Sequence, residues 1–228
     1  MLEISGRIFE DLVQIGELMK AVSNLARALL IVSCLACLGI AADDSSLKPP
    51  PGAKVAIVMF EDMECPSCAA NYPVVEEAGR THHIPVLLRD FPLGPKHPWS
   101  FDAAVWARFF DSKSEQIGRD FRAYIFKNQP QITPANLRQY VEKFANDNKV
   151  ALPFANDPEG KLKAKVQADH DLGLKLGVNS TPTIFVVSNT ESHQVDRIEN
   201  LSQVIEDVQK KVPAAPPVRS LAGKKKTS

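Results

Sequence analysis

The four cysteines of this chain form two pairs with the same spacing, Cys34 with Cys37 and Cys65 with Cys68. Two thiols three positions apart can form a disulfide and exchange it with another protein, or they can bind a metal ion together. The second pair lies in a Cys-Pro-Ser-Cys motif, between a six-residue apolar run and a helical pattern. Unpaired N–H groups and the helix dipole favour a thiolate at such a helix start. We therefore expect Cys65 to be the reactive thiol and Cys68 its partner in disulfide exchange.

A zinc site is one alternative, because a Cys-x-x-Cys pair supplies two of the four ligands that a structural zinc ion needs. The five histidines include no pair at the spacing of a zinc motif, and we expect the adjacent His82 and His83 to be solvated. We therefore predict no metal and no other cofactor. An inert role for both cysteines, as small core residues, is a second alternative.

An apolar run near the N-terminus has the features of an export signal. Residues 28–42 carry no charge and are fewer than the ~20 residues that a membrane-spanning helix needs. Lys20 and Arg27 provide a positive flank, and small residues precede a cut after Ala41. These features predict a signal peptide over residues 1–41 and a periplasmic or other extracytoplasmic location.

The residues before this flank fit a signal peptide poorly, because residues 1–18 contain four acidic side chains and one arginine. Met19 is therefore the expected true start. An uncleaved membrane anchor and lipid attachment at Cys34 are alternatives. We expect no redox role for Cys34 and Cys37, because an apolar environment raises the pKa of a thiol and makes it inert.

The composition is that of one globular domain, with 228 residues, 44% hydrophobic and 24% charged. The formal net charge of zero argues against nucleic acid as a partner. We predict a stiff linker over 42–52, a folded domain over 53–211 and a disordered tail over 212–228, where prolines precede a lysine run. We expect a monomer.

Hydrophobic periodicity predicts strands that alternate with helices. The predicted strands are 55–60, 84–91, 183–187 and 193–198. The predicted helices are 66–80, 101–111, 115–127, 134–148, 158–176 and 201–211. This order predicts an α/β fold whose sheet is covered on both faces, with a helical insertion at about 100–176. The aromatic residues Trp106, Phe109 and Phe110 of this insertion are expected to be core, not the floor of a peptide groove.

The whole pattern resembles the thioredoxin superfamily: a strand, the Cys-Pro-Ser-Cys motif, a helix, and later Thr181-Pro182-Thr183 before a strand. The helical block, together with Phe91-Pro92-Leu93 and His97-Pro98-Trp99, resembles its DsbA-like branch. The resemblance covers about residues 53–211 and implies a thioredoxin-like fold with a helical insertion.

The resemblance also implies roles for the site residues. Cys65 corresponds to the exposed nucleophile and Cys68 to the second cysteine, while Pro66 and Ser67 correspond to the two residues that tune the reduction potential. DsbA has histidine where Ser67 stands, so we expect a less oxidising centre. Pro182 corresponds to a cis proline beside the disulfide, and the residue before it, Thr181, to one that pairs with substrate backbone.

Many relatives carry a buried acid six residues before the first cysteine, where this chain has Met59. Three acids follow that position: Glu61, Asp62 and Glu64. We expect them to form a solvated rim that raises the pKa of Cys65, although one of them could replace the missing acid.

The expected function is the introduction of disulfides into exported proteins, with exported protein thiols as substrates and a membrane protein as redox partner. A periplasmic disulfide reductase or isomerase is the first alternative. A non-catalytic thioredoxin-fold binding module is the second.

Overall fold

The computed structural model describes residues 47–212, so the predicted signal peptide and the tail after Val212 lie outside the described residues. The strands are β1 (Val55–Glu61), β2 (Val86–Asp90), β3 (Thr183–Ser188) and β4 (Ser192–Gln194). The α-helices are α2 (Pro66–Thr81), α3 (Ser100–Asp111), α4 (Glu115–Asn128), α5 (Leu137–Asp147), α6 (Lys161–Lys175) and α7 (Leu201–Lys211). Short 3₁₀ turns are η2 (Gly94–Lys96), η3 (Gln129–Gln131) and η4 (Ile198–Asn200).

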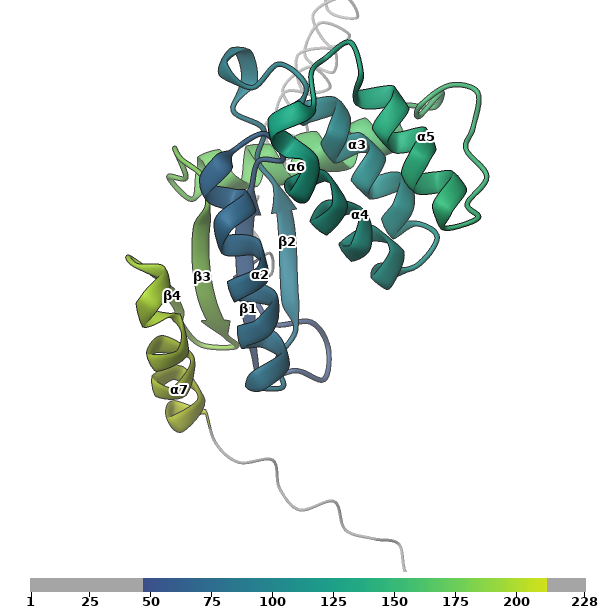
Figure 1. The fold of residues 1–228 in the computed structure, drawn as a ribbon. Coiled ribbons are helices and arrows are strands. Elements are labelled where there is room, and N and C mark those ends of the chain that lie inside the picture. The colour runs from purple at the N-terminus through teal and green to yellow at the C-terminus, as the bar shows by residue number, and fades with distance from the viewer. Residues whose placement is uncertain (1–46, 213–228) are drawn as a thin grey trace, which may run out of the picture. The chain divides into compact units, whose positions relative to one another are not determined.

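The four strands form one mixed sheet in the order β2-β1-β3-β4 (Figure 1). β1 runs parallel to β2 and antiparallel to β3, so that Ile57 lies between Val86 and Val186. All seven residues of β1 are buried. A strand with neighbours on both sides and helices on both faces reads as a continuous apolar run, which is why Val55–Phe60 lacks polar alternation.

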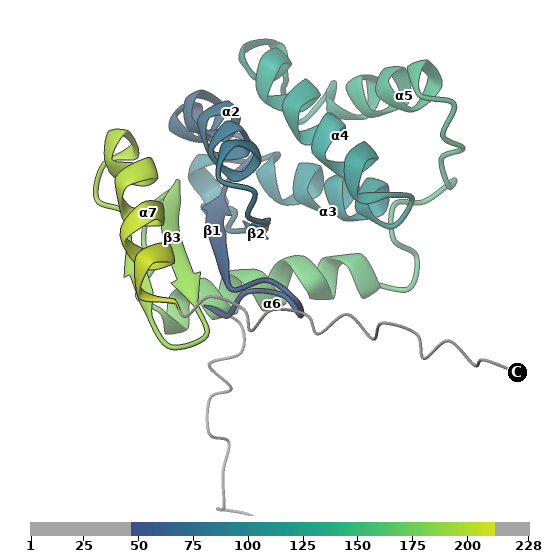
Figure 2. The same ribbon diagram turned by 90° about the horizontal axis from the view of Figure 1, so that it is seen from below.

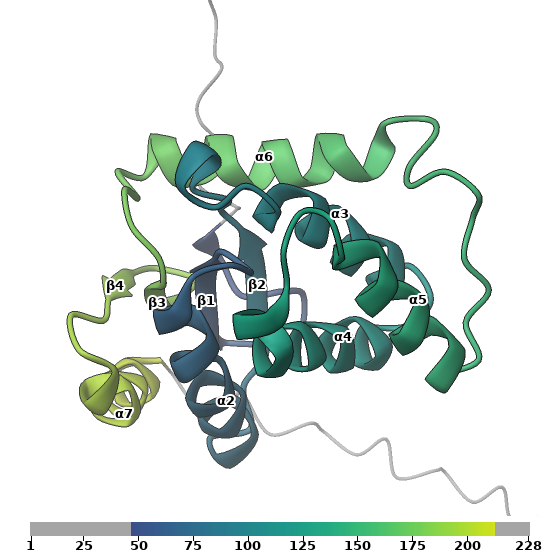
Figure 3. The same ribbon diagram turned by 45° about the horizontal axis from the view of Figure 1, so that its top comes forward.

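Alternate residues of β1 pack on opposite faces of the sheet. On one face, α2 and α7 complete a cluster with the strand residues Val55, Ile57 and Met59. On the other face, Leu172 and Leu176 at the end of α6 pack with Ala56, Val58 and Phe60. Figures 2 and 3 show α6 on the opposite side of the strands from α2 and α7. The predicted α/β fold with a sheet covered on both faces is therefore confirmed.

The helix α6, which ends the predicted insertion, packs on both the insertion and the sheet, because its Val166 lies in one cluster with Ala104 and Val105 of α3. Its end covers the sheet, where a Cβ added at Gly173 would lie 2.5 Å from the ring of Phe91 and 3.2 Å from that of Phe60. The chain thus leaves the sheet after β2, forms α3 to α5, and returns through α6. Periodicity located an apolar face on this helix but could not show which surface that face would cover.

The insertion has a hydrophobic core of its own, built by α3, α4 and α5. Trp106, Phe109 and Phe110 are all buried in it. The ring of Phe110 lies 4.5 Å from that of Phe121 and 5.0 Å from that of Phe144. The expectation that these aromatic residues are core is confirmed.

Two helices begin later than the sequence indicated. α5 begins at Leu137, because the N–H of Thr133 donates to the side chain of Asn136 at 2.7 Å and closes a turn first. α6 begins at Lys161 after Gly160, whose φ of 69° is outside the helical region. A proline after Thr or Asp marks a turn as readily as a first helical position. α7 matches its predicted range.

The described part of the predicted linker contacts the domain. Leu47 is buried against the second face of the sheet. The N–H of Ala53 donates to the carbonyl of Pro50 at 3.0 Å, which closes a turn around Gly52 with its φ of 91°. Within residues 47–212, no helix is long and apolar enough to cross a membrane.

Candidate active site

The cysteine pair lies where β1 ends and α2 begins. Cys65 is the N-cap residue of α2, in an extended conformation, and Pro66 follows at the first helical position. A proline is tolerated there because the N–H that it lacks would have no partner within the helix. Cys65 is 6% exposed and Cys68 is fully buried, and both are free thiols. Pro66 and Ser67 lie between them at the surface.

Several donors gather around the sulfur of Cys65. The hydrogen bond from the Cys68 thiol has the largest effect and lowers the pKa of Cys65, whereas burial raises it. The side chain of Thr181 and the N–H groups of Cys68 and Ser67 lower it further, so that the pKa of Cys65 is about 5. This thiol is therefore ionised at neutral pH, as the nucleophile of an exchange reaction must be.

Cys68 has the opposite environment. Burial raises the pKa of this thiol, and the hydrogen bond to the Cys65 sulfur raises it further. The N–H of Asp62 donates to the Cys68 sulfur at 3.4 Å. The two cysteines are thus distinct in character: Cys65 holds the negative charge and Cys68 holds the proton.

The loop before β3 brings Thr181 against the reactive cysteine. The Thr181–Pro182 peptide bond is cis, as the resemblance implied. In its protonated form, Cys65 donates through its sulfur to the carbonyl of Thr181 at 3.2 Å, across 116 positions of sequence. The pairing of β3 with β1 places this loop beside the start of α2. Thr181 and the two cysteines therefore meet at one place.

The prediction of a solvated acidic rim is wrong for Glu61 and Asp62, which are each only 1% exposed. Asp62 lies in the loop between β1 and α2 and has several hydrogen-bond partners. Its carboxylate accepts from the N–H of Glu64 at 2.7 Å and from the N–H of Leu93 at 2.6 Å. The Nδ1 atom of His97 lies 2.8 Å from the same carboxylate. The charge of Asp62 thus joins the active-site loop to the segment after β2.

Glu64, directly before Cys65, is partly exposed but also has a structural partner. Its carboxylate accepts from the N–H of Trp99 at 3.0 Å, at the N-terminus of α3. An acidic side chain is favourable at that end of a helix. The residue therefore connects the active-site loop to the helical insertion.

Glu61 is part of a buried charge cluster between the sheet and the helices. Its members carry four acidic and three basic side chains: Glu61, Asp90, Asp111, Asp169, Arg89, Arg108 and Arg122. Arg122 is 1% exposed. Its Nε lies 2.9 Å from Glu61, and its two terminal nitrogens lie 2.8 and 3.0 Å from Asp111.

Burial raises the pKa of Glu61 from its ordinary value of 4.5 to about 8, and the neighbouring Asp90 raises it further, while Arg122 lowers it. Folding thus keeps a proton on Glu61 that the unfolded chain releases near pH 4.5. The stabilisation linked to this proton is complete below about pH 4.5 and is lost as the pH rises towards 8. A buried acid exists near the cysteines, two residues after the position where relatives carry one.

We expect Glu61→Gln to remove this part of the pH dependence, because the amide carries no titratable proton. The free energy of unfolding of the variant, relative to the natural protein, should rise by a few kcal/mol between pH 5 and pH 8. Urea unfolding at both pH values measures this difference. The exposed Glu142→Gln is the control, and equal pH profiles for the natural protein and Glu61→Gln would show that Glu61 ionises normally.

Gln129, which lies in the turn η3 directly after α4, was not predicted as a site residue. Its side-chain Nε2 donates to the carbonyls of Met63 at 2.9 Å and Cys65 at 3.1 Å. No motif or periodicity marks a glutamine in such a turn, because its partners are 66 and 64 positions away.

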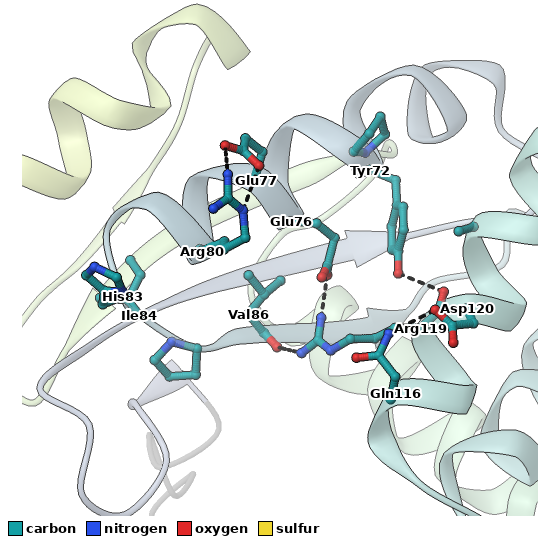
Figure 4. A pocket seen from close by; sticks show the side chains of 14 residues that line it. Tyr72, Glu76, Glu77, Arg80, His83, Ile84, Val86, Gln116, Arg119 and Asp120 are labelled. Atoms are coloured by element: carbon teal, nitrogen blue, oxygen red, sulfur yellow. Dashed lines mark hydrogen bonds and ion pairs between the residues drawn. The ribbon is translucent and has the colours of Figure 1, made fainter.

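A groove of about 730 Å³ lies between α2, the start of β2 and α4 (Figure 4). Neither cysteine lines it. Arg119 crosses it, paired with Glu76 and donating to the carbonyl of Val86 at 2.8 Å. The Tyr72 hydroxyl donates to the carbonyl of Arg119 at 3.1 Å. Arg119 and Glu76, the charges that span this groove, are therefore already paired.

A mixed sheet with a Cys-x-x-Cys pair at the start of a helix and a cis proline beside it defines a thioredoxin-like protein with a DsbA-like insertion of helices. Residues 50–207 match the family model Thioredoxin_4, described as Thioredoxin. The chain therefore belongs to the thioredoxin family, which confirms the resemblance seen in the sequence.

Solved structures with the same fold include DsbA-like proteins. Wolbachia pipientis alpha-DsbA1 is 17% identical with a TM-score of 0.57, over 72% of this chain and 90% of that protein. Proteus mirabilis ScsC is 18% identical with a TM-score of 0.56, over 93% of this chain and 100% of that protein. Pseudomonas aeruginosa DsbA2 is 18% identical with a TM-score of 0.52, over 72% of this chain and 93% of that protein. At these identities the likeness establishes the fold.

The curated relatives with similar sequences are named as Na(+)/H(+) antiporters. The Na(+)/H(+) antiporter NhaA 1 of Mycobacterium sp. (strain KMS) is 29% identical over 157 residues, which are 61% of this chain and 23% of the antiporter. NhaA 3 of Salinispora tropica is 27% identical over 165 residues, or 72% and 24%. This chain spans about a quarter of the length of these relatives.

Proposed function

We propose that this protein is an exported thiol–disulfide oxidoreductase that introduces disulfides into exported proteins through Cys65 and Cys68. The observation that carries the proposal is the position of Cys65 at the N-cap of α2, beside Cys68 and the Thr181 carbonyl, where its pKa is lowered to about 5. Stabilising the thiolate favours the reduced pair, so the disulfide form becomes a better oxidant. Comparable thiols have pKa values of about 3.5 in DsbA and about 7 in thioredoxin, and Cys65 lies between them.

The reaction begins with the pair joined by a disulfide. A substrate thiolate attacks the Cys65 sulfur, the Cys65–Cys68 bond breaks, and Cys68 leaves and takes up a proton. A second substrate thiolate then attacks the substrate sulfur of the mixed disulfide. This step forms the substrate disulfide and releases Cys65 as a thiolate. Two electrons have passed from the substrate to the pair, and an oxidant in the membrane would remove them.

Two features of the site favour the second candidate, a disulfide reductase or isomerase. Ser67 offers the Cys65 thiolate its backbone N–H but no cationic side chain. The pKa of about 5 also leaves Cys65 a stronger nucleophile than a more acidic thiol would be. We place the disulfide donor first because the Cys68 thiol and the backbone N–H groups of Ser67 and Cys68 lower the pKa of Cys65. Export, action as a monomer and a membrane redox partner are parts of the same proposal.

The test compares the two directions in one buffer. The oxidised protein is mixed with a reduced two-cysteine peptide, and the reduced protein is mixed with insulin. We expect stoichiometric disulfide formation in the peptide, faster than insulin reduction. Insulin reduction without net oxidation of the peptide would overturn the proposed direction, and no exchange in either assay would favour the binding module.

A further inference from the structure

Gln129 connects the helical insertion to the reactive cysteine. It lies at the first position of η3, where the chain leaves the last turn of α4. Its single side-chain nitrogen carries two hydrogens, and both are used: one for the carbonyl of Met63 and one for the carbonyl of Cys65. Because both hydrogens of this side chain bind main-chain carbonyls, Gln129 holds the loop between Met63 and Cys65 in place, and we call this pair of hydrogen bonds the clamp.

The two clamped carbonyls control the direction of the Cys65 side chain. Met63 is 1% exposed and packs in the core of the insertion. The carbonyl of Cys65 also accepts from the N–H of Ala69 at 3.1 Å, the first hydrogen bond of α2. The backbone before and after the Cys65 side chain is therefore held from both sides.

The same end of α4 packs in the hydrophobic cluster that contains the two cysteines. Phe126, three residues before Gln129 and so on the same helix face, lies 5.2 Å from the ring of Tyr72. It belongs to the hydrophobic cluster that contains Cys65 and Cys68. The end of α4 is thus joined to the Cys65 loop by the hydrogen bonds of Gln129 and to the cluster around the cysteines by Phe126.

We propose that Gln129 is a positioning residue, through which the helical insertion holds Cys65 in the orientation that activates its thiolate. This role rests on the proposed function. Without the clamp, the Met63–Cys65 loop can move, and Cys65 separates from the Cys68 thiol and from the backbone N–H groups of Ser67 and Cys68. The negative charge on Cys65 then loses stabilisation, and its pKa rises.

The test uses the full chain and two variants, Gln129→Glu and Gln129→Ala. Glutamate has the shape of glutamine, but when ionised it cannot donate and faces two carbonyl oxygens. The rate of alkylation of Cys65 by iodoacetamide is followed across pH by tandem mass spectrometry, whose fragment ions distinguish Cys65 from Cys68 within the peptide that contains both. We expect the midpoint to rise by at least about one pH unit in both variants, so that alkylation at pH 5 slows about fivefold.

The matched control is Asn128→Ala in the neighbouring position. The side chain of Asn128 donates to the carbonyl of Tyr124 at 2.7 Å and so only closes the end of α4. This variant should lower the melting temperature and leave the Cys65 midpoint unchanged. An unchanged midpoint in both Gln129 variants, or an equal shift in Asn128→Ala, would overturn the positioning role.

The alkylation test is independent of the proposed function, because it needs no substrate protein. If the natural protein exchanges no disulfide but the Gln129 variants shift the midpoint, the proposed function fails and the positioning role stands. If the natural protein exchanges disulfides and the midpoint does not move, the positioning role alone fails.

Discussion

Cys65→Ser abolishes disulfide transfer to the level of the uncatalysed reaction, whereas Cys68→Ser stops the reaction halfway. Cys65 is the ionised thiol of the pair and keeps 6% of its surface exposed, whereas Cys68 is fully buried, so the loss of Cys65 removes the sulfur of this pair that a substrate would attack. In Cys68→Ser, Cys65 still forms a mixed disulfide, but no neighbouring thiol is present to resolve it. The covalent adduct should therefore accumulate.

The measurement is transfer to the two-cysteine peptide, with mass spectrometry of the protein after incubation with glutathione disulfide. Cys34→Ser with Cys37→Ser is the control and should transfer normally. Transfer by Cys65→Ser at the natural rate would contradict the assignment of the nucleophile. An unchanged biological function of that variant would favour the non-catalytic binding module.

Arg122→Met destabilises the fold more than any surface change of similar size. Arg122 is the buried cation that faces Glu61, Asp90 and Asp111, and methionine replaces its stem but not its charge. Breaking a buried pair leaves buried carboxyl groups without compensation, which costs about 3–5 kcal/mol. Thermal melting should show a decrease in melting temperature of roughly 10 °C.

The control for this prediction is Arg138→Met, because Arg138 pairs with Glu142 on the exposed face of α5. An exposed pair contributes less than about 1 kcal/mol. A second comparison adds Glu61→Gln to Arg122→Met. Since the two side chains are in contact, the double variant should lose less than the sum of the two single losses. Equal losses for Arg122→Met and Arg138→Met would show that the buried cluster contributes no more than a surface pair.

The local pattern of the sequence was sufficient for the centre of the fold. Val55–Phe60 could be recognised as a buried strand from its apolar run, and the helix after Cys65 from its periodicity, because both signals depend on neighbouring residues. Together with Thr181-Pro182 these elements gave the thioredoxin-like fold. The same local signals placed α7, but they could not assign α6 to the sheet, since both possible surfaces are apolar.

The surroundings of the cysteines could not be predicted in the same way, because they depend on distant partners. Glu61 is buried since Arg122, 61 positions later, supplies a guanidinium from the insertion. Asp62 is buried since backbone N–H groups and His97 converge on it. From the sequence alone, a run of acids before a cysteine indicates a solvated loop, because only the fold shows which distant groups lie beside these acids.

The reduction potential of the Cys65–Cys68 couple tests the proposed direction of electron flow most directly. It is measured by equilibration with glutathione in the full chain with Cys34→Ser and Cys37→Ser. The Cys65 pKa of about 5 is nearer to that of DsbA than to that of thioredoxin, so we expect a potential less negative than about −200 mV. A value more negative than about −230 mV would place the pair with the reductants and contradict the introduction of disulfides.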